Sequence, residues 1–354
     1  MKRTERWWRG LVVTAVLVGV LITAAPALGL TLTGAGATFP QPLYSKWAKD
    51  YNAATKVRVN YSGVGSGTGI AQIKAGTVNF GASDKPSTPA DLNSWGIAQF
   101  PSCVGGVVPI IHLTDRAGNR IGNGRLKLTG SVLSLIYRGK ITKWSDSRIT
   151  SLNRGLRLPS SRIRVFHRSD ASGTSWIFTH YLKAVDSAFP FADMNGAWPV
   201  GTGARGNQGV ANGVKTNSGA IGYVEYAYSI QARTPYVQLK NKAGHWVLPS
   251  LGTFAAAASH ATWSAKAAFV TNLVNMRGTT SWPITGATYI LVRKAQKSYS
   301  LGHGVLAFFN WGLTKAKGKT DARVLQYVSL PSGAVKKIKA SWHTSIRAGS
   351  KPCW

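Results

Sequence analysis

The sequence predicts an α/β fold with a parallel sheet, and three observations support this class. Strand, glycine-rich turn and helix succeed one another repeatedly along the chain, an order that is typical of parallel α/β folds. Hydrophobic residues make up 44% of the 354 residues, so the chain can bury the cores of two ordinary domains. The glycine-rich turns lie between strands and helices, where ligands of such folds bind.

The N-terminal segment 1–29 has the features of a secretory signal peptide. Four basic residues precede an uncharged apolar stretch, and small residues then fit a cleavage motif at Ala27-Leu28-Gly29. An uncleaved membrane anchor is the alternative, because the apolar stretch is just long enough to span a bilayer. Pro26 and the small residues favour cleavage near Gly29, so we expect a free mature chain in the periplasm.

The first third of the chain alternates strands with helices. Alternation and β-branched residues predict the strands, glycine runs predict the turns, and aromatic residues at helical spacing predict the first helix. The predicted strands are 30–33, 57–61 and 78–82, the predicted turns are 34–39 and 63–69, and the predicted helices are 41–52 and 70–75. The repetition of this unit predicts strands that lie parallel in one sheet.

The same succession returns later in the chain. A strand at 162–166, a polar turn at 168–172 and a helix at 173–182 follow one another, and further strands are predicted at 220–223 and 289–292. Units that could hold an anion therefore occur in two places that are far apart in the sequence. Two lobes that meet over one ligand would bring these units together.

Three of the turns carry the donors that a small tetrahedral anion needs. Such an anion is bound by N–H groups at helix N-termini, by hydroxyls, and by backbone that glycine allows to come close. The turns 34–39 and 65–69 supply glycines and hydroxyls, and 168–175 adds the guanidinium of Arg168. One glycine-rich turn is usually only a turn, but three between strands and helices predict an anion site.

Asp84 directly follows the predicted strand 78–82 and would place a carboxylate beside the anion. A carboxylate repels an anion unless that anion still carries a proton, as the HPO4 and H2PO4 forms of phosphate do. Sulfate at neutral pH has no such proton, and an unpaired buried acceptor costs on the order of a few kcal/mol. The alternative role for Asp84 is a helix N-cap ahead of Pro86.

Positive charge is extreme, because 43 Lys and Arg residues face 11 Asp and Glu residues. Such a balance often marks nucleic-acid binding, but the basic residues are scattered, and export separates the chain from nucleic acid. Two interpretations remain open. The charge either steers anions toward the protein or reflects an acidic medium in which carboxylates are protonated, and its spread over the whole chain favours the second.

Cys103 and Cys353 are the two cysteines of the chain. In an oxidising periplasm they could form a disulfide that ties the C-terminal tail to the middle of the chain. Two unpaired thiols are the alternative.

Eight stretches of the chain carry longer motifs. They begin at Thr33 (TGAGATFPQPLYSKW), Val59 (VNYSGVGSGTGIAQI), Val78 (VNFGASDKP), Arg168 (RSDASGTSWIFTHYL), Gly206 (GNQGVA), Gly219 (GAIGYVEYAY), Ser281 (SWPITGATYILV) and Val305 (VLAFFNW). In content and order they resemble the periplasmic phosphate-binding protein of the bacterial phosphate ABC transporter, over nearly all of the mature chain.

The resemblance implies a two-lobed type II periplasmic binding-protein fold. Each lobe would be a mixed, mostly parallel sheet flanked by helices, with the ligand in the cleft between the lobes. Lobe I would combine 30–104 with 287–354, and lobe II would be 105–286. The resemblance also implies phosphate ligands: the amides of Thr38 and Phe39, the amide and hydroxyl of Ser66, the proton acceptor Asp84, the bidentate donor Arg168 oriented by Asp170, and Ser172, Gly173 and Thr174 of lobe II.

The same resemblance implies high-affinity binding of protonated phosphate and its delivery to the permease subunits of an ABC importer. The receptor is expected to be a monomer without cofactor, metal or enzymatic activity, and Tyr223 and Glu225 are expected to pack near the cleft. A secreted phosphatase or a phosphate-binding surface adhesin is the alternative. Against a phosphatase, the seven histidines show no metal-ligand spacing and Ser66 lies in no G-x-S-x-G motif. A G-x-G-x-x-G string at 201–206 lacks a predicted strand before it, which argues against a dinucleotide enzyme.

Overall fold

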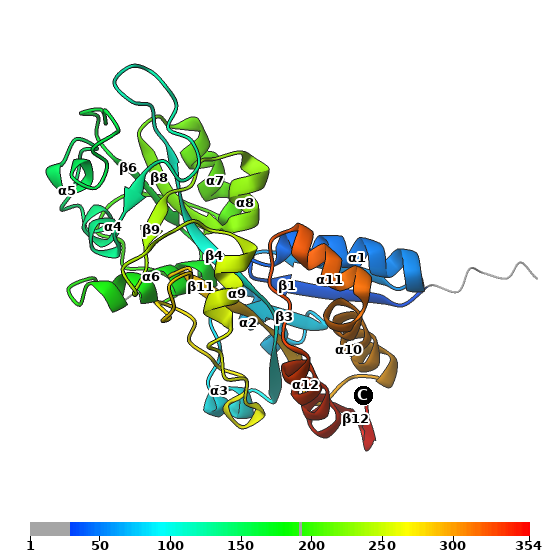
Figure 1. The fold of residues 1–354 in the computed structure, drawn as a ribbon. Coiled ribbons are helices and arrows are strands. Elements are labelled where there is room, and N and C mark those ends of the chain that lie inside the picture. Colours follow the sequence, from blue (N-terminus) through cyan, green and yellow to red (C-terminus); the bar gives the residue numbers. More distant parts are fainter. Residues whose placement is uncertain (1–28, 191–192) are drawn as a thin grey trace, which may run out of the picture.

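The computed structural model describes residues 29–190 and 193–354 (Figure 1). The predicted signal peptide lies outside these residues except for Gly29. Eight strands form one continuous mixed sheet in the order β2-β1-β3-β11-β4-β8-β6-β7, with helices packed around it, which confirms the α/β class. Their bounds are β1 Thr31–Gly36, β2 Arg58–Gly63, β3 Phe80–Ser83, β4 Ile97–His112, β6 Arg164–Arg168, β7 Thr202–Ala204, β8 Ala220–Glu225 and β11 Thr285–Arg293.

The first half of the molecule is built on β1, β2 and β3, which run parallel. Helix α1 (Gln41–Thr55) follows β1, and α2 (Ser66–Ala75) follows β2. The predicted turn 63–69 was therefore too long. Gly65 takes the sharp bend with a φ of 100°, after which the chain is already helical at Ser66.

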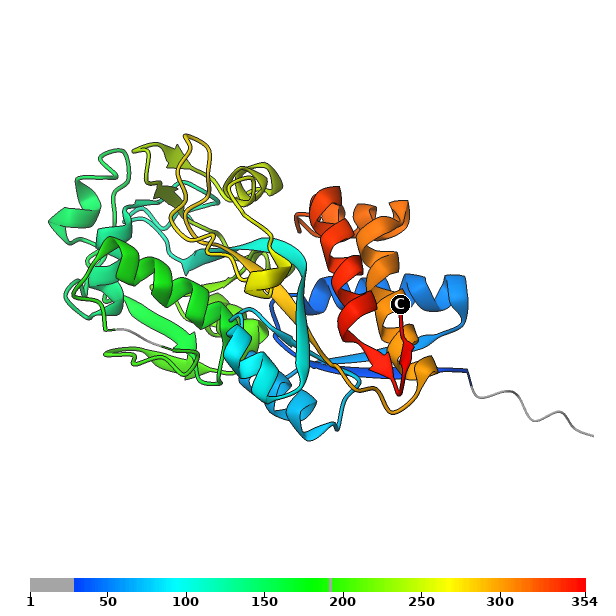
Figure 2. The same cartoon turned by 90° about the horizontal axis from the view of Figure 1, so that it is seen from below.

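The C-terminal helices complete this first half. In the view from below in Figure 2 they gather beside α1, away from the helices of the second half. The C-terminal helices are α10 Tyr299–Thr314, α11 Ala316–Val324 and α12 Ser332–Ser345, and the short strands β12 Arg347–Ala348 and β13 Lys351–Pro352 follow them. The short helix α3 Pro89–Ser94, between β3 and β4, also belongs to this half. The first half is therefore assembled from both ends of the described chain.

Two strands, β4 and β11, cross from one half to the other (Figure 1). Strand β4 pairs with β11 along residues 97–106 and with β8 along residues 107–112. A bulge shifts the register of β4 at Ser102, opposite Thr288 of β11. The predicted lobe boundaries at 104/105 and 286/287 fall on these two strands, and the division into lobes stays a prediction.

The second half extends the sheet through β8, β6 and β7, which run parallel to one another. Helix α6 (Gly173–Val185) follows β6, and α7 (Gly206–Thr216) follows β7. The remaining elements are α4 Gly130–Tyr137, α5 Ser147–Thr150, α8 Tyr226–Ala232, α9 Leu251–Ala258, a 3-10 turn Ala265–Ala267, and the small sheet of β5 Lys127–Leu128, β9 Gln238–Lys240 and β10 Trp246–Val247. In the described part of the chain, every helix is too short or too polar to cross a bilayer.

Aromatic side chains fix the helices against the sheet in both halves. In the first half, Tyr44 of α1 and Phe80 of β3 both pack edge-on against Phe309 of α10, with ring centroids 5.7 and 5.1 Å apart. In the second half, Tyr223 of β8 stacks on Phe178 of α6 at 4.2 Å. Buried aromatic pairs of this kind hold α1 and α6 in place, so the first turns of these helices have defined positions.

The disulfide between Cys103 and Cys353 is not formed, because both thiols are free and buried in separate places. Cys103 lies on β4 with its sulfur 3.9 Å from Ser102 Oγ, whereas Cys353 packs against Gly302 of α10. Burial raises the pKa of the Cys103 thiol, so this side chain is inert rather than reactive.

Candidate anion-binding site

Four helices begin at one place between the two halves of the molecule. Helices α1 and α2 come from the first half, and α6 and α7 come from the second. Hydrogen bonds connect these starts directly: Gly173 N donates to Ser66 Oγ at 3.1 Å, and Asn207 N donates to Thr38 Oγ1 at 3.2 Å. Because helix starts present N–H groups and positive dipole ends, this place suits an anion.

The hydroxyls of Thr38 and Ser66 can act in this site only as donors to a ligand. Thr38 Oγ1 accepts hydrogen bonds from the backbone and side-chain amides of Asn207 at 3.2 and 2.7 Å. Ser66 Oγ accepts from the amides of Asp84 and Gly173 at 3.3 and 3.1 Å. A hydroxyl has two lone pairs and one proton, so each of these protons remains to be donated to an acceptor.

Arg168 ends β6 and is 2% exposed. Its Nε donates to Asp170 Oδ1 at 2.7 Å and its Nη2 donates to Oδ2 at 2.5 Å. Asp170 therefore occupies the Nε–Nη2 edge of the guanidinium, and the Nη1–Nη2 edge is left for a bidentate contact with an anion. Nη1 is buried and has no hydrogen-bond partner in the structure, so a ligand acceptor is expected there, since a buried donor without an acceptor is costly.

Asp170 connects this arginine to helix α7. It accepts a hydrogen bond from Gly206 N at 3.0 Å. Burial alone would raise the pKa of Asp170, but the hydrogen bonds and charge of Arg168 and the Gly206 amide outweigh burial and lower this pKa. Asp170 is therefore ionised and fixes the direction in which Nη1 points.

Asp84 follows β3, is 1% exposed and faces both halves. Thr288 Oγ1 donates to its Oδ1 at 2.6 Å, and Thr174 Oγ1 donates to its Oδ2 at 3.4 Å. Burial raises the pKa of Asp84 to about 7, although the Thr288 bond, the charge of Arg168 and the Thr174 bond oppose this rise. Asp84 thus changes protonation state in the same pH range as phosphate.

The alternative role for Asp84, an N-cap, is wrong. The next helix, α3, begins at Pro89, and its N-cap is Thr88, whose hydroxyl accepts a hydrogen bond from Asp91 N at 3.1 Å. The carboxyl of Asp84 faces Thr288 of β11 and the Thr174 hydroxyl at the start of α6, and it does not cap α3.

Ser172, Gly173 and Thr174 form the start of α6 and touch the first half. Ser172 Oγ accepts from Ser175 N at 3.1 Å, which caps the helix and leaves the hydroxyl proton to donate. A Cβ atom on Gly173 would lie 2.6 Å from Ser66 Oγ, so only glycine fits there. All nine residues expected at the site are buried or half-buried, Phe39 among them.

Sequence reasoning missed three residues that organise the site. Asn207 Nδ2 donates to Thr38 Oγ1 at 2.7 Å and to Thr174 Oγ1 at 3.2 Å, and so bridges the two halves. Thr288 holds Asp84, and Tyr228 Oη donates to Thr38 O at 2.6 Å. The stretches that begin at Gly206, Gly219 and Ser281 contain Asn207, Tyr228 and Thr288, but nothing in these stretches singles out the three residues as site residues.

Glu225 and Tyr327 form a second buried contact between the halves. Tyr327 Oη lies 2.7 Å from Phe39 O and 2.7 Å from Glu225 Oε2. A tyrosine hydroxyl has one proton and a carbonyl has none, so serving both contacts requires a proton on Glu225. Burial, the largest cause, raises the pKa of Glu225 well above its usual range, which agrees with a neutral carboxyl.

The two halves also touch at the edge of the site. Gly67 N donates to Ala171 O at 3.0 Å, and Lys85 pairs with Asp193 at 2.8 Å. The two halves therefore contact each other at the site as well as through β4 and β11. No group of three or more His, Cys, Asp or Glu side chains in residues 29–190 and 193–354 is arranged to hold a metal ion.

Related sequences match this chain over nearly its whole length. Residues 23–315 match the PBP superfamily domain. The phosphate-binding protein PstS of Xylella fastidiosa is 44% identical over 328 residues, which cover 92% of this chain and 88% of the relative. PstS of Pasteurella multocida is 42% identical over 346 residues, which cover 96% of this chain and 98% of the relative.

Solved structures share the fold. A high-affinity periplasmic phosphate-binding protein, solved with phosphate at pH 8.5, has a TM-score of 0.72 at 23% identity and covers 88% of this chain and 94% of its own. The phosphate-binding protein of Stenotrophomonas maltophilia has a TM-score of 0.67 at 21% identity, covering 89% of this chain and 94% of its own. Together with the sequence matches, these place the chain in the PstS family of phosphate-binding proteins, in the PBP superfamily.

Proposed function

We propose that this protein is the receptor of a phosphate ABC importer, which binds inorganic phosphate in its protonated forms and delivers it to permease subunits. The names of its relatives and the phosphate-bound structure of the same fold support this role. The observation that carries the proposal is the chemistry of the site. One buried carboxyl, Asp84, lies among hydroxyl, amide and guanidinium donors.

The proposed ligands divide into donors and one acceptor. Arg168 donates from Nη1, which extends the expected role of this residue to the atom that Asp170 leaves available. The other free donors are the amides of Thr38, Phe39 and Ser66 and the hydroxyls of Thr38, Ser66 and Ser172. The Gly173 amide and the Thr174 hydroxyl donate to Ser66 Oγ and to Asp84 in the structure, and they are proposed to turn to the ligand when it binds. Asp84 is the acceptor, and Asp170 keeps Arg168 in position.

Selectivity follows from the proton on the ligand. HPO4 and H2PO4 donate a hydrogen bond to ionised Asp84, whereas sulfate brings only acceptors and meets the carboxylate as a like charge. An unpaired buried charge of this kind costs about 1–3 kcal/mol or more, which is roughly tenfold to hundredfold in affinity. Neutral Asp84 could donate to either anion, so discrimination should weaken in acid.

Capture is proposed to proceed by closure of two lobes, 30–104 with 287–354 and 105–286. The crossing strands β4 and β11 would be the hinge. A ligand that contacts Ser66 in one lobe and Gly173 in the other favours the closed form through its differential affinity for that form. The receptor is proposed to act as a monomer in the periplasm, without a cofactor and without enzymatic activity.

Isothermal titration calorimetry of the purified mature protein tests the site. Phosphate should bind tightly and sulfate should not. Asp84→Asn should reduce the ratio of phosphate to sulfate affinity by at least about tenfold, because an amide can donate to either anion. Asp91→Asn, an exposed change in the first turn of α3, is the matched control and should leave the ratio unchanged. An unchanged ratio in Asp84→Asn would remove Asp84 from the selectivity argument.

The phosphatase alternative has its own test. The purified protein should not turn over p-nitrophenyl phosphate at a rate above buffer. Turnover that disappears in Ser172→Ala would replace the receptor proposal with an enzyme.

A further inference from the structure

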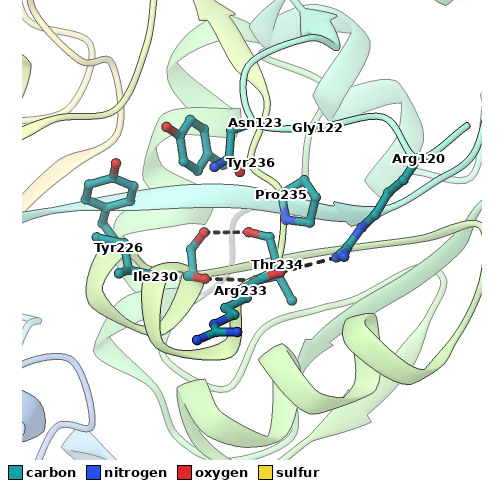
Figure 3. Close-up of a pocket in the computed structure, with 10 residues that line it drawn as sticks. Arg120, Gly122, Asn123, Tyr226, Ile230, Arg233, Thr234, Pro235 and Tyr236 are labelled. Carbon is teal, nitrogen blue, oxygen red and sulfur yellow. Dashed lines mark hydrogen bonds between the residues drawn. The ribbon is translucent and has the colours of Figure 1, made fainter.

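A second pocket lies on the surface of the second half, at the C-terminal end of α8 (Figure 3). Its volume is about 410 Å³. The loop after β4 forms one wall, and the end of α8 with the segment that follows it forms the other. The lining residues are Arg120, Gly122, Asn123, Tyr226, Ser229, Ile230, Arg233, Thr234, Pro235 and Tyr236.

The floor and rim of this pocket are apolar and aromatic. The rings of Tyr226 and Tyr236 meet edge-on with centroids 5.5 Å apart. Ile230 is 48% exposed at the rim. Leu248, which is 45% exposed, lies over Gly124, whose amide donates to Tyr236 O at 2.8 Å. Two of the few large apolar side chains exposed in the described chain therefore flank the same pocket.

The pocket also carries two guanidinium groups without an anionic partner. Figure 3 shows Arg120 and Arg233 on the side away from the two tyrosine rings. Arg120 Nη2 donates to the backbone oxygen of Arg233 at 3.2 Å. Neither arginine forms an ion pair within residues 29–190 and 193–354, and no lining residue is acidic.

The other acidic residues of the chain are all engaged elsewhere. Of the 11 in the sequence, Glu5 lies outside the described residues, which leaves 10. Each of these ten carboxyl groups holds a hydrogen bond or an ion pair with a group other than Arg120 and Arg233: Asp50, Asp84, Asp91, Asp115, Asp146, Asp170, Asp186, Asp193, Glu225 and Asp321. The two arginines are therefore open to an anionic group of another molecule.

We propose that this pocket docks an acidic segment of a partner protein, with a carboxylate between Arg120 and Arg233 and an apolar side chain against Tyr226 and Tyr236. Tyr and Arg dominate the residues that contribute most to protein–protein binding, and they do so in apolar pockets. Exposed Ile230 and Leu248 extend the surface beyond the pocket, which suits a protein segment. The inference rests on the proposed function, and the partner is then the membrane permease.

Helix α8 connects this pocket to the anion site. Tyr226 and Ile230 face the pocket, whereas Tyr228 donates to Thr38 O at 2.6 Å in the first half. Glu225 caps the same helix through Ala227 N at 3.0 Å and contacts Tyr327. These contacts of α8 join the two halves, so the proposed opening of the lobes would break them, and a partner bound at the pocket would then distinguish the closed form from the open form.

The test measures binding of the full mature protein, with phosphate, to the permease complex of the same organism in nanodiscs. Arg120→Glu and Arg233→Glu should each weaken this binding by at least about tenfold, and calorimetry should show unchanged phosphate affinity. Arg154→Glu, an exposed arginine of the same half outside the pocket, is the matched control and should bind the permease as the unmodified protein does.

Three outcomes would overturn the proposal. If Arg233→Glu binds the permease as tightly as the unmodified protein does, the docking surface lies elsewhere. If Arg154→Glu loses as much affinity as Arg233→Glu, the loss comes from the change in overall charge and not from the pocket. Self-association in sedimentation velocity that disappears in Arg233→Glu would assign the pocket to a second copy of the chain. Failure of the proposed function is distinguishable from these, because the unmodified protein would then bind neither phosphate nor the permease.

Discussion

Gly173 is one of the residues at which the two halves approach closely in the anion site. An added Cβ would lie 2.6 Å from Ser66 Oγ and 2.7 Å from Asp84 N. Atoms at these distances overlap, and Asp84 N belongs to the backbone, so it cannot move aside as the end of a flexible side chain could. The absence of a side chain at position 173 is therefore a condition for closure, separate from the donation of its amide.

Gly173→Ala should weaken phosphate binding by at least about tenfold, because the methyl group holds the halves apart. Calorimetry measures the affinity, and thermal unfolding followed by circular dichroism shows whether the protein stays folded. Gly209→Ala in α7 is the control, since a Cβ there meets no atom closer than 3.5 Å. Equal losses in the two variants would contradict the steric argument.

Some residues of the anion site can be predicted from the sequence and others cannot. The expected site residues lie in turns between strands and helices, and such turns carry glycine and hydroxyl patterns. Asn207 and Thr288 carry no such pattern. Thr288 lies 204 positions from Asp84, and only the pairing of β11 with β3 and β4 brings it to that carboxyl.

Among the elements, β4 and β11 place the acceptor of the site. The bulge at Ser102 interrupts their register next to Thr288, and Ser102 Oγ donates to Thr288 O at 3.2 Å. A bulge bends a strand and re-aims its side chains. In this position it lets Thr288 reach Asp84 from the strand that also connects the halves.

Thr288→Val should shift the pH dependence of phosphate binding upward. Valine keeps the shape but removes the hydrogen bond that lowers the pKa of Asp84, so this pKa should rise above about 7. A carbon-13 NMR titration of the aspartate carboxyls checks it. Thr285→Val is the control on the same strand, because its hydroxyl donates to Trp282 O instead. An unchanged titration of Asp84 would show that Thr288 does not tune it.

The elements that sequence reasoning misjudged have physical causes. Helix α2 begins at Ser66 inside a glycine-rich stretch with low helix propensity, but Gly69 packs directly on Gly36, a contact that larger residues could not make. Strand β7 has three residues, two of them outside the β-branched class, and is stabilised by pairing with β6 at the sheet edge. In both cases tertiary packing outweighs local preference.

At the scale of the whole molecule, buried acids and paired acids respond to pH in opposite directions. The pKa values of Asp84 and Glu225 are raised, mainly by burial, so their contribution to stability is complete below about pH 4 and is lost as pH rises through their folded pKa values. The Lys317 hydrogen bond lowers the pKa of Asp50 to about 2, so its contribution is lost only as pH falls toward that value.

The protein without phosphate should therefore unfold at a higher temperature at about pH 4.5 than at about pH 8. Thermal unfolding by circular dichroism at both values measures the difference. Glu225→Gln should reduce the difference, because an amide stays neutral throughout. A difference of opposite sign, or one unaffected by Glu225→Gln, would contradict the assignment of buried neutral acids. An acid preference, if measured, would agree with the interpretation that the positive charge reflects an acidic medium.

The ten engaged carboxylates restrict how this protein can change over evolution. Further gain of positive charge by deletion of acids would remove a helix cap, an ion pair, a hydrogen bond within a turn or part of the ligand site. Gain of negative charge is open at many positions, since most of the Lys and Arg side chains have no ion-pair partner among the described residues. Descendants that live at neutral pH can therefore gain acidic residues without losing an existing ion pair, whereas adaptation to a more acidic medium can remove few acidic residues without losing a contact.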